Sequence, residues 1–103
     1  MNIELHHDVA RRRNEIAQMC AQLGVRRLDL FGSAARGGPA QDLDFLVDLG
    51  ERAPVEYSKT YFALHDRLAE LFACPVDLIT APALQNPYFR QRVEEQKLLL
   101  YAA

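Results

Sequence analysis

Cysteine is scarce in this chain, and long apolar runs are missing. Only Cys20 and Cys74 occur among its 103 residues, too few and too far apart for a disulfide framework or a cysteine-rich zinc site. No window approaches the roughly 18 to 20 consecutive apolar residues that a membrane span needs. The first residues lack a basic region followed by an apolar stretch, so we expect no export signal. These absences favour a cytoplasmic protein with reduced thiols and no membrane contact.

An excess of positive charge is also lacking. Twelve Lys and Arg stand against 14 Asp and Glu, for a net charge of -2. A sequence-independent nucleic-acid clamp is normally basic, so we expect no direct nucleic-acid binding. Half of the residues are hydrophobic and a quarter are charged, which is typical of a globular chain with one core.

Apolar periodicity predicts the order helix, strand, strand, helix, strand, helix. Asp8 is expected to cap the first helix and Gly24 to end it, while Asn86 is expected to cap the last. The final apolar segment, 98–101, fits a short strand or an apolar tail. We therefore expect an α+β or α/β fold, with a small mixed sheet of three to four strands and helices packed on it. The predicted helices cover 8–23, 55–73 and 87–96, and the predicted strands cover 26–31, 42–49 and 76–80.

Two carboxylates in the second predicted strand are the first sign of chemistry. Asp42 and Asp44 are two positions apart, so in a strand they face the same side, about 6 to 7 Å apart. Like charges placed there repel each other, and a divalent cation removes that repulsion. Carboxylates that leave coordination positions open suit Mg²⁺ or Mn²⁺ shared with substrate phosphates.

The turn before this strand is suited to binding phosphate. A strand that ends in Gly32-Ser33 exposes backbone N–H groups and a hydroxyl. Gly32 lets the backbone approach a ligand closely, Ser33 can bond a phosphate oxygen, and Arg36 can add charge-assisted contacts. Asp77 is a third candidate acid, because it interrupts an otherwise apolar strand.

Together these residues resemble the minimal nucleotidyltransferases of the DNA polymerase beta superfamily. The resemblance rests on Gly32-Ser33, on Asp42-x-Asp44 and on Asp77 in a later strand. The run 31–37, the strand 45–47 and the ending 86–101 are similar to the small antitoxin-type members. The resemblance spans nearly the whole chain, and it implies a polymerase-beta-like fold with residues 1–103 as a single minimal nucleotidyltransferase domain.

The resemblance also implies an activity. A nucleotidyl group, AMP if ATP is the donor, would pass from a nucleoside triphosphate to a partner protein with loss of pyrophosphate. Asp42, Asp44 and Asp77 would be the catalytic and metal-binding residues for Mg²⁺ or Mn²⁺. Gly32, Ser33 and Arg36 would bind the nucleotide phosphates. In the family the partner is commonly a helical HEPN-type toxin, which makes an antitoxin role in a toxin–antitoxin pair the leading hypothesis.

Alternatives from other classes stay open at this stage. Eight residues, 34–41, separate Ser33 from Asp42, and members of the family usually have more residues there. Gln41 stands directly before Asp42. A catalytically decayed module that neutralises a toxin by binding alone would fit that shortening. A D-x-D glycosyltransferase using Mn²⁺ is a third hypothesis, disfavoured by the short chain. The apolar helix faces could serve a homodimer or a hetero-oligomer equally well.

Overall fold

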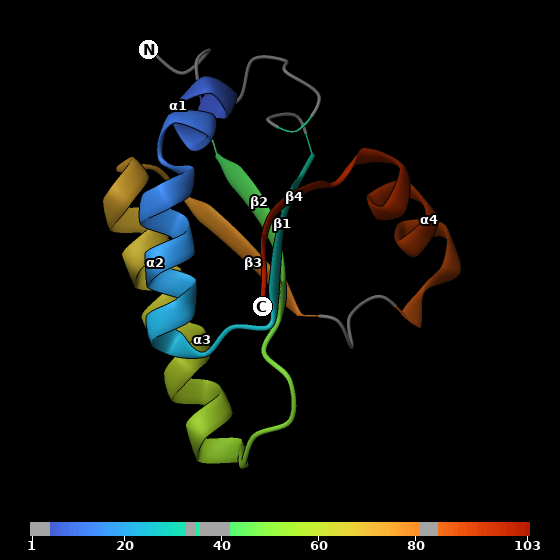
Figure 1. The fold of residues 1–103 in the computed structure, drawn as a ribbon. Coiled ribbons are helices and arrows are strands. Elements are labelled where there is room, and N and C mark those ends of the chain that lie inside the picture. Colours follow the sequence, from blue (N-terminus) through green and yellow to red (C-terminus); the bar gives the residue numbers. More distant parts are fainter. Residues whose placement is uncertain (1–4, 33–34, 36–41, 81–84) are drawn as a thin grey trace.

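The fold of the described residues consists of three layers, a sheet with three helices on one side and a single helix on the other (Figure 1). The structure is a computed structural model that describes residues 5–32, 35, 42–80 and 85–103. In the described part, no helix is long and apolar enough to cross a membrane. The helices are α1 (Leu5–Arg11), α2 (Arg13–Leu23), α3 (Pro54–Phe72) and α4 (Pro87–Gln96), and the strands are β1 (Arg27–Phe31), β2 (Leu43–Asp48), β3 (Val76–Thr80) and β4 (Leu98–Ala102).

The sheet is mixed, with the order β3-β2-β1-β4. β1 pairs antiparallel with both β2 and β4. β2 and β3 are parallel and are joined by the crossover helix α3, as parallel neighbours require. This confirms the predicted mixed sheet of three to four strands, and it makes the segment after Lys97 a strand rather than a tail.

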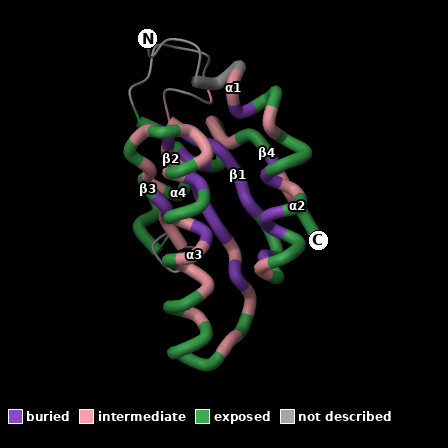
Figure 2. The backbone as a smooth tube through the Cα atoms, turned by 90° about the vertical axis from the view of Figure 1, so that its left-hand side faces the viewer, coloured by how far each residue is buried: buried purple, intermediate pink, exposed green. Residues whose placement is uncertain are grey.

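Each face of the sheet buries its own apolar cluster. The larger cluster joins alternate residues of the strands, such as Leu28 and Phe45, to Ile16 of α2 and Leu64 of α3. The smaller cluster joins Phe31, Leu46 and Val93 of α4 on the opposite face. Buried residues run along β1 and β2, the two central strands (Figure 2). Along β2, Leu43, Phe45 and Val47 belong to the larger cluster and Leu46 to the smaller one, so both faces of the strand are covered.

The N-terminal helical segment differs from the prediction. A single helix capped by Asp8 was expected, but Asp8 lies inside α1 and bonds Arg11, and the helix is interrupted at Arg12. Two helix ends lie where the sequence predicted them, at Gly24 and at Asn86. Gly24 adopts a left-handed φ of 70° after α2, where glycine has no steric penalty. The Asn86 side chain accepts hydrogen bonds from the first amides of α4, at 3.0 and 3.2 Å.

One charged residue is buried within the sheet. Asp29 in β1 is only 1% exposed. Arg27 donates to its two carboxylate oxygens at 2.9 and 3.2 Å, and this pairing raises the pKa of the Arg27 guanidinium. The bidentate bond offsets the cost of burying the carboxylate. Asp29 is therefore paired with Arg27 on the sheet face that α4 covers. It is not part of the acidic group at the end of the sheet.

Candidate active site

The topology brings the predicted acids to one end of the sheet. Because β1 and β2 are antiparallel, the end of β1 lies beside the start of β2, and the parallel strand β3 starts at the same end. Gly32 follows β1, Asp42 precedes β2, Asp44 is the second residue of β2 and Asp77 the second of β3. Four of the six residues predicted to form the site are thus gathered from three separate segments.

Asp44 and Asp77 are direct partners in the parallel ladder. Neighbouring strands lie about 4.8 Å apart, and partner residues project from the same face. This face is the one that carries Phe31 and Leu46 and is covered by α4. Asp77 is exposed, and Asp44 is half-buried. The two carboxylates therefore form an acidic pair that is open to solvent at the end of the sheet.

Gly32 is in close contact with this pair. Its φ is +77°, in the left-handed region, and a Cβ added at Gly32 would lie 2.4 Å from Oδ2 of Asp44. Both the backbone conformation and the lack of space exclude a side chain here. The sequence predicted a close approach between Gly32 and a ligand. In the structure the backbone of Gly32 approaches the carboxylate of Asp44.

The local electrostatics raise the pKa of the Asp44 carboxyl above its usual value. Burial is the largest cause, followed by the negative charges of Asp42 and Asp77. The Asp42 charge also contributes, after burial, to a raised pKa of the neighbouring Cys74 thiol. Both effects have the sign expected where carboxylates accumulate and are partly buried. The three acids predicted from sequence therefore interact with one another.

These donors fit a Mg²⁺ or Mn²⁺ ion shared with a substrate. In the described ranges, no group of three or more His, Cys, Asp and Glu side chains is by itself arranged to hold a metal ion. Hard cations of this kind usually take one or two protein carboxylates and complete their coordination with water and substrate phosphates. The acids around Asp44 match that incomplete, oxygen-only donor set, and they do not match an all-protein cage.

A cavity of about 210 Å³ adjoins Gly32 and Asp44 and is closed on the other side by α4. Its lining adds Arg92, an exposed cation that the sequence analysis did not single out. The helical spacing of Phe89, Arg92, Val93 and Gln96 was a signal for one shared face. What the sequence could not indicate is that this face lies over Asp44. The cavity thus has the Asp44 carboxylate at one wall and the Arg92 guanidinium at the other.

Two predicted phosphate ligands cannot be placed. Ser33 and Arg36 lie outside the described residues, as does most of the segment between Gly32 and Asp42. The sequence-based expectation that they bind phosphate stays a prediction.

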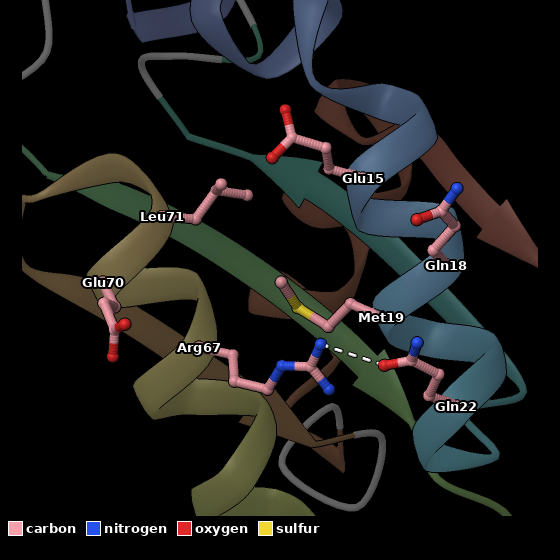
Figure 3. A pocket seen from close by; sticks show the side chains of 7 residues that line it. All are labelled: Glu15, Gln18, Met19, Gln22, Arg67, Glu70 and Leu71. Carbon is pink, nitrogen blue, oxygen red and sulfur yellow. Dashed lines mark hydrogen bonds between the residues drawn. The ribbon is translucent and has the colours of Figure 1, made fainter.

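A larger hollow, of about 430 Å³, lies elsewhere, between α2 and α3. Figure 3 shows its lining, where Arg67 of α3 donates a 3.0 Å hydrogen bond to Gln22 of α2. These helices cover the sheet face opposite to the one that carries Asp44 and Asp77. The hollow is therefore separate from the candidate active site.

The chain belongs to the nucleotidyltransferase domain family, whose model, "Nucleotidyltransferase domain", matches residues 13–100. The matched range contains every element of the candidate site. This membership is consistent with the acidic pair and the glycine beside it, and it agrees with the resemblance drawn from the sequence.

Known proteins similar to this chain are small and match over most of their length. "Putative protein adenylyltransferase MJ0128" of Methanocaldococcus jannaschii is 33% identical over 90 residues, 85% of this chain and 87% of the relative. A solved "putative minimal nucleotidyltransferase" is 30% identical, with a TM-score of 0.66 and 95% of both chains covered. The tri-AMPylated Shewanella oneidensis HEPN toxin in complex with MNT antitoxin matches with a TM-score of 0.65 at 20% identity, over 92% of this chain and 73% of that chain. The last likeness establishes the shared fold.

Substituting Gly32→Ala tests the close approach to Asp44. The left-handed φ costs an alanine about 1 kcal/mol, and the Asp44 carboxylate has to move away from the new methyl group. We expect a lower midpoint of urea unfolding and a loss of nucleotidyl transfer of about 100-fold, since small displacements of catalytic groups have effects of that size.

Gly50→Ala is the matched control for this substitution. Its φ is +70°, and the added Cβ would meet only the flexible Arg26 side chain, at 2.7 Å from Cδ. Gly50→Ala should lower stability to a similar extent and leave transfer intact. Equal losses of transfer in both variants would contradict the assignment of Gly32 to the site.

Substituting Asp44→Asn tests the electrostatics of the acidic group. A carboxyl whose pKa is raised by folding favours the folded state while protonated, and this contribution is lost as the pH rises from its unfolded pKa, near 4, through its folded pKa. At pH 7 the variant should therefore be more stable than the wild type. The site is open to solvent, so we expect about 0.5 kcal/mol, or roughly 2 to 4 °C in Tm.

Two comparisons make this measurement specific. The stability difference between Asp44→Asn and wild type should shrink as the pH falls from 7 toward 4. Asp48→Asn on the same strand should show no gain, because Asp48 accepts a 2.8 Å hydrogen bond from the Gly50 amide that an Asn oxygen can also accept. A destabilised Asp44→Asn protein at pH 7 would be the contrary result.

Proposed function

We propose that this chain is a metal-dependent adenylyltransferase, which transfers AMP from ATP to a hydroxyl group of a partner protein. Asp42, Asp44 and Asp77 are assigned to hold Mg²⁺ or Mn²⁺. Gly32, Ser33 and Arg36 are assigned to the nucleotide phosphates. The partner is a HEPN-type toxin, and the chain acts as the antitoxin of that pair in the cytoplasm.

The observation that carries this proposal is the pairing of Asp44 with Asp77 beside Gly32. Two adjacent strands place carboxylates side by side next to a turn that has no side chain, in a chain of the nucleotidyltransferase family. A purely structural sheet has no need for two acids at partner positions, where like charges are destabilising. Family membership also favours nucleotidyl transfer over the sugar transfer considered from the D-x-D pattern alone.

The reaction requires orientation and charge compensation more than a reactive side chain. The acceptor oxygen forms a bond to the α-phosphorus, the bond from this phosphorus to the bridging oxygen breaks, and pyrophosphate leaves with the electron pair. The hydroxyl proton is lost to solvent. Asp42, Asp44 and Asp77 would provide the carboxylate ligands of a metal ion, which would supply Lewis-acid polarisation of the phosphate and compensate for charge on the leaving group. Arg92, on the opposite wall of the cavity, adds a fixed positive charge toward the anionic nucleotide.

The acceptor is proposed from the relatives. The M. jannaschii relative carries the name of a protein adenylyltransferase, and the S. oneidensis complex joins an MNT antitoxin to a HEPN toxin that is tri-AMPylated. The described part of this chain consists of the sheet and its covering helices, so a protein that presents its own hydroxyl group fits the open acidic end. Among amino acids that carry a hydroxyl group, a tyrosine of the partner is the acceptor of AMP that the resemblance to the minimal nucleotidyltransferases favours.

The direct test is transfer of labelled AMP. The chain is incubated with α-labelled ATP, Mg²⁺ and the product of the neighbouring gene as the candidate partner, and this partner is analysed by intact-mass spectrometry. We expect a mass increase of the partner by AMP units. Asp42→Asn/Asp44→Asn should reduce transfer by at least about 100-fold, as loss of electrostatic stabilisation does in other enzymes, whereas Asp48→Asn should retain it.

Two outcomes would contradict the proposal. One is an unmodified partner while a known adenylyltransferase works under the same conditions. The other is a pair of results, in which the wild type transfers no label and the Asp42→Asn/Asp44→Asn variant still neutralises the toxin fully. That pair would support neutralisation by binding alone.

A further inference from the structure

Two side chains of α3 bind the backbone of β3 on either side of Asp77. The Tyr61 hydroxyl donates a 2.6 Å hydrogen bond to the carbonyl oxygen of Leu78. Nε2 of His65 lies 3.0 Å from the carbonyl oxygen of Val76. A carbonyl can only accept, so this contact is a hydrogen bond when Nε2 carries the hydrogen, while Nδ1 lies 3.1 Å from Oδ1 of Asp66. Asp77 is the residue between these two carbonyls.

The geometry of the edge strand gives these bonds their importance. Among the strands that the structure describes, β3 is the last on its side of the sheet and has β2 as its one strand neighbour. Leu43 donates to the carbonyl of Pro75 at 3.1 Å, so alternate backbone groups of β3 face β2. The carbonyls of Val76 and Leu78 face the open edge, where Tyr61 and His65 reach them. Edge strands otherwise expose such groups to solvent.

The two donors act as a unit because of their spacing. Tyr61 and His65 are four positions apart on one helix, so they lie on the same face of α3, about one turn from each other. The two carbonyls are two positions apart on β3, on the same edge. The spacing of the two side chains along α3 is therefore similar to the spacing of the two carbonyls along β3. Both side chains are half-buried. Movement of the strand at Asp77 requires at least one of these hydrogen bonds to break.

We propose that Tyr61 and His65 are positioning residues that hold the Asp77 carboxylate in register with Asp44 for metal binding. This inference rests on the proposed function, because it assigns a role to the strand that carries Asp77. The parallel ladder fixes β3 from one side, and the two side chains fix it from the other. These two residues act on the metal site through the backbone that carries Asp77.

The test is Mn²⁺ binding followed by NMR, which needs neither nucleotide nor partner. Mn²⁺ is titrated into the ¹⁵N-labelled chain, and the broadening of the Asp44 and Asp77 amide signals gives an apparent Kd. Tyr61→Phe removes only the hydroxyl, and His65→Leu removes the ring donor. Each should weaken Mn²⁺ binding by about 10-fold, as loss of outer-shell support does at other metal sites. His65→Gln, which restores an N–H donor, should recover part of the affinity.

Tyr57→Phe is the matched control, the same chemical change one turn earlier on α3. Tyr57 packs against the larger core cluster, and its substitution should leave the Kd unchanged. All titrations are done at a temperature where circular dichroism shows each variant folded. Should His65→Leu fail to fold, Tyr61→Phe decides the question alone.

The outcomes separate this inference from the proposed function. Weaker Mn²⁺ binding in Asp77→Asn, with unchanged binding in Tyr61→Phe and His65→Leu, would overturn the positioning role and leave the metal site in place. Unchanged binding in Asp77→Asn would overturn both the metal role of Asp77 and the inference built on it. A failure of AMP transfer alone would affect only the proposed reaction.

Discussion

The parallel register of β2 and β3 is the constraint on which the rest of the site depends. It sets the carboxylates of Asp44 and Asp77 side by side at the end of the sheet, and burial together with the neighbouring charges raises the pKa of Asp44. Nothing in the apolar packing of the sheet requires two acids at these positions. Local arrangements that oppose stability are expected at functional sites. A bound cation is the simplest compensation for this one.

The described part of the site is assembled on strands and helices. Gly32 directly follows β1 and leaves space for the Asp44 carboxylate. α3 holds the edge strand that carries Asp77, and α4 closes the cavity with Arg92. Sites built on strands and helices hold their geometry more accurately than sites on loops. A transfer reaction that depends on alignment of donor, metal and acceptor benefits from such a frame.

Much of this arrangement was accessible from local sequence signals. Apolar alternation placed Asp44 opposite the main core, and Asn86 marked the start of α4. The break at Arg12 was missed because no proline or glycine marks it. The order of the strands, the contact of His65 with β3 and the position of Arg92 over Asp44 arise from tertiary packing. Periodicity within a single segment contains no information on which segments become neighbours.

The measurement that tests the central claim most directly is a crystal structure with Mn²⁺ and a non-hydrolysable ATP analogue. The account predicts an anomalous Mn²⁺ peak at roughly 2.0 to 2.3 Å from carboxylate oxygens of Asp42 and Asp44, with Asp77 facing the same region and the nucleotide phosphates beside Gly32. A nucleotide bound elsewhere, or a well-occupied nucleotide with no metal peak near these acids, would contradict it.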